Sequence, residues 1–163
     1  MTRLLGAACA LLLAVSGSAG AQSTAPLAVT RPDGSSVTLE AAQLAALPRV
    51  SGQATAHGHT FTFEGSDLRG VLRLAGVTPV DSLRRAQLRR VVIFVGADGY
   101  SAVIALSDLD ASIGARSAVL VDREDGKPLS AEMGPRRVIV EGDQRPTRWV
   151  RQLVRLEVRD IPE

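Results

Sequence analysis

Cysteine, histidine and aromatic residues are all scarce in this chain of 163 residues. It contains one cysteine, two histidines, one tryptophan, one tyrosine and three phenylalanines. A single cysteine cannot form a disulfide framework within the chain. Because aromatic side chains are so few, the core must consist of aliphatic residues. The residues able to stack on a planar ligand can therefore be named one by one.

A large excess of charge of either sign is also lacking. Nineteen basic residues stand against seventeen acidic ones, which gives a net charge of +2. A charge so close to balance is not that of a nucleic-acid-binding domain, so we expect no nucleic-acid partner. Apolar residues make up 45% of the chain and charged residues 22%, the composition of a chain that folds around a core.

Several catalytic motifs are missing as well. The sequence has no phosphate-binding loop, no nucleophile elbow, no zinc-protease motif and no glycine-rich dinucleotide turn. Its two histidines form the triplet His57-Gly58-His59, and in an extended stretch both rings would lie on one face. A metal site needs further ligands from elsewhere, so a surface or hydrogen-bonding pair is favoured and we expect no metal.

The first 21 residues have the layout of a secretory signal peptide. Arg3 precedes an apolar run from Leu4 to Val15, and small residues then lead to Ala19-Gly20-Ala21. We predict cleavage before Gln22 and a periplasmic or secreted protein. The apolar run is shorter than the about 20 residues that span a bilayer, so no stable membrane insertion is expected after cleavage. An uncleaved anchor is the alternative.

Cleavage would leave no cysteine, because the single cysteine of the chain is Cys9. A thiolate nucleophile or thiolate metal ligand is then excluded from residues 22–163. We predict that these residues form one α+β domain, with a mixed β-sheet core and short helices. About eight short strands are expected: Leu27–Arg31, Ser36–Leu39, Thr60–Glu64, Val91–Val95, Ser101–Leu106, Ala118–Asp122, Arg137–Glu141 and Leu156–Arg159, with Val50–Ala56 as a further candidate.

Helices are expected at five places between these strands. The first runs from Glu40 to Leu47, and the second starts at Ser66 or Asp67 and ends at Gly76. The others are a helical turn within Asp81–Arg90, a short turn capped by Ser107-Asp108 and a short helix from Thr147 to Leu153. The run Val91–Val95 is the strongest signal for a buried strand.

The residues best suited to a ligand lie at the ends of these elements. Tyr100 and Trp149 have aromatic faces with a polar group, and Arg136, Arg137, Arg145 and Arg148 cluster near Trp149. Arg137 opens an apolar strand, so we expect its side chain beside a wall that an anion or planar heterocycle could use. Asp98 and Glu132 are candidate acceptors for a heterocycle's amidine edge. Core packing of the aromatics and a solvated arginine face are the alternatives.

Five segments in order resemble one known family. They are Phe63-Glu-Gly-x-x-Leu68-Arg-Gly-Val-Leu-Arg-Leu-Ala-Gly76, Val91-Val-Ile-Phe-Val-Gly-Ala-Asp-Gly-Tyr-Ser-Ala-Val-Ile104, Asp125-Gly-Lys-Pro-Leu129, Gly134-Pro-Arg-Arg-Val-Ile-Val140 and Arg145-Pro-Thr-Arg-Trp-Val-Arg-Gln-Leu153. This order resembles the sulfite-oxidase-type oxidoreductase molybdopterin-binding domain, over roughly Val50 to Val158. The resemblance implies the fold of that domain.

The chain departs from the family's catalytic pattern at two places. Members hold molybdenum through a cysteine just before the turn that matches Gly99-Tyr100, and Val95–Asp98 contains none. Catalytic members also carry His-Gly before the Pro-x-Arg segment, where this chain has Met133-Gly134. These departures predict a short, cysteine-less member that is not catalytic.

The resemblance also implies a ligand and a partner. In the family, the arginine matching Arg137 and the segment matching Thr147–Trp149 lie near the pterin and its phosphate. Short, secreted, cysteine-less relatives bind reduced pterins and signal to membrane sensor proteins. We therefore expect a periplasmic module that binds a reduced pterin or molybdopterin-like ligand and contacts the extracytoplasmic domain of a membrane sensor. The predicted ligand-binding residues are Tyr100, Asp98, Glu132, Arg137, Arg148, Trp149 and His57.

Two other functions remain open at this point. One is a molybdopterin-dependent oxidoreductase domain or subunit that holds its metal without a cysteine. The other is a structural accessory domain whose pocket is filled by its own side chains.

Overall fold

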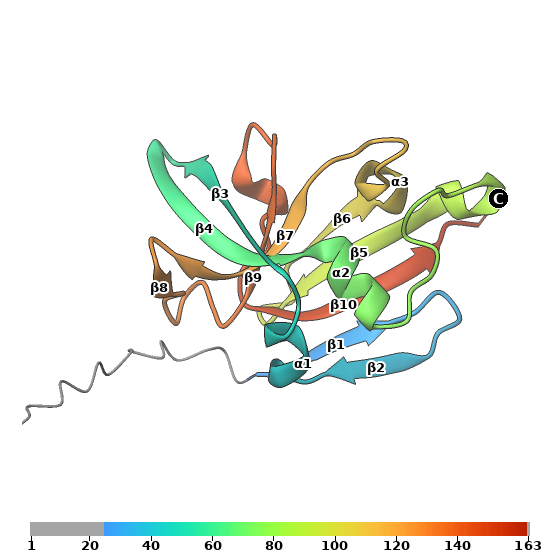
Figure 1. The fold of residues 1–163 in the computed structure, drawn as a ribbon, viewed down its shortest axis with the longest axis horizontal. Coiled ribbons are helices and arrows are strands. Elements are labelled where there is room, and N and C mark those ends of the chain that lie inside the picture. Colours follow the sequence, from blue (N-terminus) through green and yellow to red (C-terminus); the bar gives the residue numbers. More distant parts are fainter. Residues whose placement is uncertain (1–24, 163) are drawn as a thin grey trace, which may run out of the picture.

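The computed structural model describes residues 25–162, which form two β-sheets with short helices at their edges (Figure 1). Sheet A has the strand order β2-β1-β10-β5-β6. Its strands are β1 (Leu27–Thr30), β2 (Ser36–Leu39), β5 (Arg90–Gly96), β6 (Ser101–Ala105) and β10 (Leu153–Asp160). Strand β1 pairs parallel to β10 and the other neighbours pair antiparallel, so the sheet is mixed as predicted.

Sheet B is antiparallel and contains a long, twisted hairpin. Its order is β3-β4-β7-β8, and β9 also pairs with β7. The strands are β3 (Arg49–Ala56), β4 (His59–Asp67), β7 (Ala118–Glu124), β8 (Lys127–Pro128) and β9 (Arg137–Val140). Strand β4 pairs with β3 along its length up to Ser66, and its pairing with β7 shifts register between Glu64 and Gly65, where Asp122 of β7 is the extra residue.

Two hydrophobic clusters hold the sheets together. The main core joins one face of sheet A, the helices and one face of sheet B, and Phe94, Leu72 and Leu120 are among its buried residues. A smaller cluster covers the opposite face of sheet B and contains Phe61, Phe63, Val119, Val121 and Ile139. Residues 118–121 of β7 and all of β9 are therefore buried on both faces, whereas β3 alternates exposed and half-buried residues.

The helices are short and begin or end at recognisable signals. They are α1 (Ala41–Ala45), α2 (Leu68–Leu74), α3 (Leu106–Leu109) and the 3-10 turns η1 (Arg85–Arg89) and η2 (Pro146–Arg148). At the start of α2, Asp67 Oδ1 accepts the backbone N–H of Arg69 at 2.7 Å. Gly76 follows the helix at φ 80°, a conformation that glycine adopts without strain.

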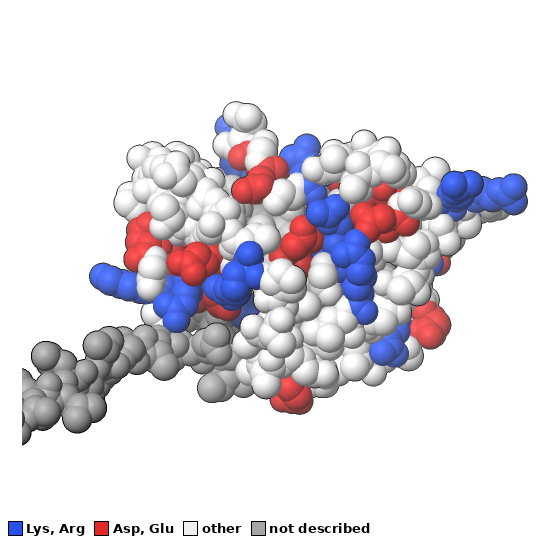
Figure 2. All heavy atoms as spheres, viewed as in Figure 1, with Lys and Arg blue, Asp and Glu red and all other residues white. Residues whose placement is uncertain are grey.

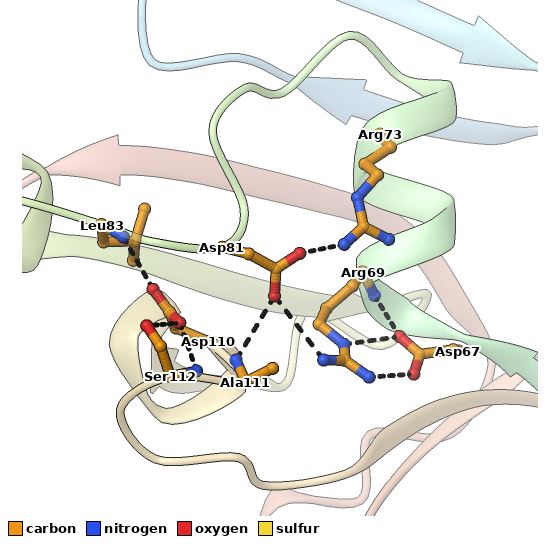
Figure 3. A network of polar contacts seen from close by, with 8 residues as sticks. All are labelled: Asp67, Arg69, Arg73, Asp81, Leu83, Asp110, Ala111 and Ser112. Atoms are coloured by element: carbon orange, nitrogen blue, oxygen red, sulfur yellow. Dashed lines mark hydrogen bonds and ion pairs between the residues drawn. The ribbon is translucent and has the colours of Figure 1, made fainter.

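A network of carboxylates and arginines fastens α2 to the loops beside it (Figure 3). Asp81 is contacted by Arg73 and, at 3.6 Å, by Nη1 of Arg69. Arg69 also pairs with Asp67, whose Oδ2 lies 2.9 Å from Nη2. These ion pairs are half-exposed, so each contributes little alone, but together they fix the end of α2 against the following loop.

Asp110 forms the buried part of this network. Its carboxylate is fully buried and accepts the Ser112 hydroxyl at 2.6 Å, the Leu83 backbone N–H at 2.7 Å and the Ser112 backbone N–H at 2.7 Å. The hydroxyl of Ser112 and the N–H of Leu83 together lower the pKa of Asp110 to about 2. Asp110 therefore stays charged and joins the loop before η1 to the loop after α3.

The structure confirms the α+β class and most predicted elements, and corrects three of them. Segment Thr147–Leu153 is not a helix, because the 3-10 turn η2 ends at Arg148 and Leu153 already belongs to β10. Helix α3 begins at Leu106, so Ser107 lies inside it instead of capping it. Strand β5 is buried on one face only, since Val91, Ile93 and Val95 are half-buried on the outer face of sheet A.

Acidic and basic side chains alternate over the face shown in Figure 2, apart from basic side chains gathered at the end that carries η1. This agrees with the near-balanced charge of the sequence. In the part of the chain that the structure describes, no helix is long and apolar enough to cross a membrane. The predicted signal peptide, residues 1–21, lies outside the described residues.

Candidate functional site

Trp149 lies where the two hydrophobic clusters meet. Its side chain packs against both clusters, and its indole N–H donates to the backbone carbonyl of Val140 at 3.0 Å. The ring meets Phe61 edge to face, with centroids 6.5 Å apart and planes at 86°. The hydrogen bond fixes the edge of the indole, so only its faces are left for other contacts.

Arg137, the first residue of β9, is buried against the same two rings. Its guanidinium carbon lies 5.1 Å from the centre of the Phe61 ring and 5.7 Å from that of Trp149. This places Arg137 beside an aromatic wall, as its position at the start of an apolar strand predicts. Burial lowers the pKa of Arg137, and the charge of Glu124 acts in the opposite direction.

The polar contacts of Arg137 are incomplete. Its Nη1 lies 2.7 Å from Oε1 of Glu124 and 3.6 Å from the sulfur of Met133. Glu124 Oε1 and Arg137 Nε are nevertheless buried without a hydrogen-bond partner in the described part of the chain, so the Glu124 contact is an ion pair of poor hydrogen-bond geometry. A buried N–H donor without an acceptor is costly in a fold, and a bound water, ion or ligand that accepts from it would remove that cost.

Two cavities meet at Trp149, which lines both of them. The Tyr100 cavity has a volume of about 240 Å³ and is lined by Asp98, Tyr100, Pro146, Thr147, Trp149 and Arg151. The Glu141 cavity has a volume of about 390 Å³ and is lined by Gln53, Ala54, Thr55, Ile139, Glu141, Gly142, Asp143, Gln144 and Trp149. The volume of the second is within the range of about 300–1,000 Å³ that is usual for small-molecule pockets.

The polar groups of the Tyr100 cavity are mostly engaged. The hydroxyl of Tyr100 donates to the backbone carbonyl of Thr147 at 2.6 Å, and Asp98 Oδ1 accepts the backbone N–H of Tyr100 at 2.9 Å. Arg151 pairs with Glu132 at 2.9 Å. The Tyr100 ring is 51% exposed, so its face is available to a ligand although its hydroxyl is taken.

In the Glu141 cavity, one carboxylate is engaged and the other is not. Asp143 accepts from Arg148 Nε at 3.0 Å, is also contacted by Arg148 Nη2, and lies 3.5 Å from Arg116 Nη1. The side chain of Glu141 lies over Gly52 of β3, where an added Cβ would be only 2.8 Å from Glu141 Oε1. No hydrogen bond or ion pair holds the Glu141 carboxylate within residues 25–162.

The structure brings some of the predicted ligand-binding residues together and separates others. Asp98, Tyr100 and Trp149 line one cavity, and Arg137 lies against Trp149. Arg148 turns to Asp143 at the edge of the other cavity. Glu132 is highly exposed, lines neither cavity and reaches the site only through Arg151.

The pair His57 and His59 is not arranged as an extended stretch would place it. His57 has φ 52° in the turn between β3 and β4, whereas His59 starts β4 and stacks on Phe61 at 6.2 Å. The two rings therefore do not share one face of a strand, and His57 lines neither cavity. Among residues 25–162 no group of three or more histidine, cysteine, aspartate or glutamate side chains is placed to hold a metal ion.

A larger cavity, about 530 Å³, lies on β3 and β4 and is lined by none of the predicted ligand-binding residues. Its one cation, Arg49, forms two hydrogen bonds with Asp122, at 2.7 and 2.6 Å. We therefore place the candidate site at Trp149, where aromatic faces and uncommitted polar groups occur together.

The sequence analysis did not identify Glu124 or Glu141 as site residues. Glu124 contacts Arg137 of β9, and Glu141 lies over Gly52 of β3, and no local pattern in the sequence indicates either contact.

Comparisons with known proteins agree with this fold. A family model described as the oxidoreductase molybdopterin binding domain matches residues 25–163. Twenty-eight chains of solved structures also match. One is the sulfane dehydrogenase SoxCD from Paracoccus pantotrophus, with a TM-score of 0.63 and 19% sequence identity; the match covers 84% of this chain and 38% of that one. No curated protein matches the sequence.

Proposed function

This chain belongs to the oxidoreductase molybdopterin-binding domain family, and on that premise we propose that it binds a pterin-type ligand at the Trp149 site outside the cytoplasm. The observation that carries the proposal is the contact of Arg137 with Phe61 and Trp149, with a buried Nε that lacks a hydrogen-bond partner in the described residues. An aromatic wall and an unpaired donor suit a planar heterocycle rich in acceptors.

The side chains at the site match the parts of a pterin. The face of Trp149, which lines both cavities, would contact the flat pyrimidinone ring, and the face of Tyr100 would contact the part of the ligand that enters the Tyr100 cavity. Carboxylates would accept its amidine-like N–H edge. Arg151 lines the Tyr100 cavity and would donate to the carbonyl oxygen or to a polar tail. Arg137 lines neither cavity but lies against the Trp149 ring, and it would donate through its unpaired Nε.

The same residues do not fit a metal held by a thiolate. The one cysteine of the sequence is Cys9, outside the described residues, and the described residues offer no clustered metal ligands. Among residues 25–162, the donors that line the two cavities at Trp149 are carboxylates, amides and guanidinium groups, with no soft thiolate. In this proposal the pterin part is the ligand, and the protein's role is binding.

The location and the partner are proposed from the sequence. The layout of residues 1–21 supports an extracytoplasmic protein. A binding module of this kind acts through a second protein, and the proposed partner is the extracytoplasmic domain of a membrane sensor that recognises the loaded form. Tyr100, which lines the Tyr100 cavity and is 51% exposed, is the residue through which a partner would detect the ligand.

A second candidate is a molybdopterin-dependent oxidoreductase domain or subunit. The family description and the fold shared with a sulfane dehydrogenase support it. The match spans only 38% of that dehydrogenase chain. In this case, a further domain or a second protein would complete the site and supply the metal ligand.

One purification distinguishes the two candidates. The protein is isolated without oxygen from its native host, and its bound molecules are identified by mass spectrometry while metals are measured in the same sample. A reduced pterin without molybdenum supports the binding module. A molybdenum-bearing molybdopterin in stoichiometric amount supports the oxidoreductase and overturns the first proposal. An empty protein that also takes up no added pterin overturns both.

A further inference from the structure

We propose that Glu141 selects the ligand by accepting two N–H groups from the 2-amino-4-oxo edge of a pterin whose ring lies in the Glu141 cavity. This inference rests on the proposed function and adds to it the residue that determines specificity. It also assigns the ring to the larger of the two cavities at Trp149, which leaves the Tyr100 cavity to the tail.

The position of the Glu141 carboxylate is the first observation. Glu141 follows directly after β9, and its side chain crosses to the inner face of β3, where it lies over the backbone of Gly52. A Cβ at Gly52 would come within 2.8 Å of Glu141 Oε1 and within 2.6 Å of the Phe63 ring. The missing side chain at this position therefore leaves the space that the carboxylate occupies.

The second observation is that this carboxylate is uncommitted. Three carboxylates line the two cavities, and two are engaged: Asp143 by Arg148 and Arg116, and Asp98 by the backbone N–H of Tyr100. Within the described chain, Glu141 has no ion pair and no side-chain hydrogen bond. A half-buried carboxylate that faces a cavity without a partner has both oxygens available to a ligand.

The chemistry of a pterin fits this arrangement. Its amino group and the adjacent ring N–H point in the same direction, and a carboxylate accepts two such parallel bonds. Ile139 and Trp149 line the same cavity and provide the apolar wall for the ring. Lumazine has a carbonyl where pterin has the amino group, so it would turn an acceptor toward Glu141. A site built for donors rejects such an analogue strongly, because its own polar group remains unpaired.

The experiment compares these two ligands on the purified protein. Pterin and lumazine, each in its oxidised and its tetrahydro form, are titrated anaerobically into wild type, Glu141→Gln and Glu141→Asp. Calorimetry gives the affinity, and the fluorescence of Trp149, the one tryptophan of the sequence, reports binding at the site. Glu64→Gln is the matched control, because Glu64 lies on β4 outside both cavities.

We expect wild type and Glu64→Gln to bind pterin at least roughly 100-fold more tightly than lumazine. Glu141→Gln should reduce this preference to about 10-fold or less, mainly through weaker pterin binding, because the amide offers only one acceptor. Glu141→Asp retains the charge but shortens the side chain, so it should give an intermediate preference. The emission maximum of Trp149 without ligand shows whether each variant is folded.

The other outcomes separate this inference from the function on which it rests. If Glu141→Gln and Glu141→Asp bind pterin with the wild-type preference, the role of Glu141 is wrong and the pterin-binding function stands. If Glu132→Gln removes the preference instead, the carboxylate suggested by the sequence is the acceptor and Glu141 is not. If wild type binds neither ligand in either oxidation state, the proposed function fails and this inference fails with it.

Discussion

The guanidinium of Arg137 lies against the indole of Trp149, 5.7 Å from the ring centre, although the two residues belong to different segments of the chain. Arg137 is fixed by β9, which pairs with β7, and Trp149 is fixed by its hydrogen bond to Val140 at the other end of β9. The short strand β9 therefore determines the positions of both Arg137 and Trp149. Changes to either residue should affect the stability and the ligand site together.

Trp149→Ala should lower stability and abolish pterin binding. Truncation of a large aromatic residue in a core costs about 3–5 kcal/mol, and Trp149 should fall near the lower end because it is half-buried. Trp149→Phe retains an aromatic face and loses the bond to Val140, which costs about 1 kcal/mol. Urea unfolding and calorimetric titration with pterin check both. Wild-type affinity in Trp149→Ala would show that Trp149 is a packing residue only.

Glu124→Gln should be more destabilising than Arg137→Met. The first change leaves the buried guanidinium of Arg137 without its carboxylate, at a cost of roughly 1–3 kcal/mol. The second removes the charge, retains an apolar contact with Phe61 and leaves Glu124 partly hydrated. Urea denaturation at neutral pH measures the two free energies of unfolding. The reverse order would mean that the Arg137 charge stabilises the fold by itself.

Asp110→Asn should change the response of the protein to acid. The pKa of Asp110 is lowered from 3.8 to about 2, so its charged form stabilises the fold above about pH 4. This stabilisation is lost as the pH falls toward 2. Wild type and Asp110→Asn should therefore differ most at neutral pH and converge toward pH 2, as measured by urea midpoints. Asp33→Asn, in an exposed turn, is the matched substitution and should show a small difference throughout.

Gly65→Ala should disrupt sheet B. A Cβ at Gly65 would lie 2.1 Å from the backbone carbonyl oxygen of Leu120, and a backbone atom in a paired strand cannot move aside. The cost should be at least the about 1–3 kcal/mol of an overpacked core. Thermal unfolding measures it. Gly70→Ala is the control, because its Cβ would meet only the Leu47 side chain at 4.0 Å and should leave the melting temperature unchanged or raised.

The sequence correctly predicted the elements whose structure depends on interactions between residues that are close together in the chain. The turn after Leu27–Thr30 and the helix Leu68–Leu74 depend on neighbouring residues, namely an Asp-Gly turn, and an aspartate cap with a glycine after the helix. The helix predicted for Thr147–Leu153 was wrong because strand pairing takes precedence over the local sequence signal there. Leu153 is the first residue of β10 and pairs with Gly96 of β5.

The site was predictable only in part, for a related reason. Aromatic residues at element ends and an arginine at the start of an apolar strand are visible in the sequence, and the structure brings Trp149 and Arg137 into contact. Glu141 has no such local sign. Its carboxylate reaches the cavity because Gly52, on a distant strand, leaves room for it. A contact between residues so far apart in the chain leaves no hydrophobic periodicity or motif in the sequence.

The parallel pairing of β1 with β10 also determines when the domain can fold. Strand β10 lies between β1 and β5, so it is the link that joins the β1–β2 hairpin to the β5–β6 hairpin. Until Leu153–Asp160 has left the ribosome, sheet A exists only as two separate hairpins, which are marginally stable in water. This sheet can therefore be completed only after β10 has been synthesised, and its many contacts between distant parts of the chain make its folding slow.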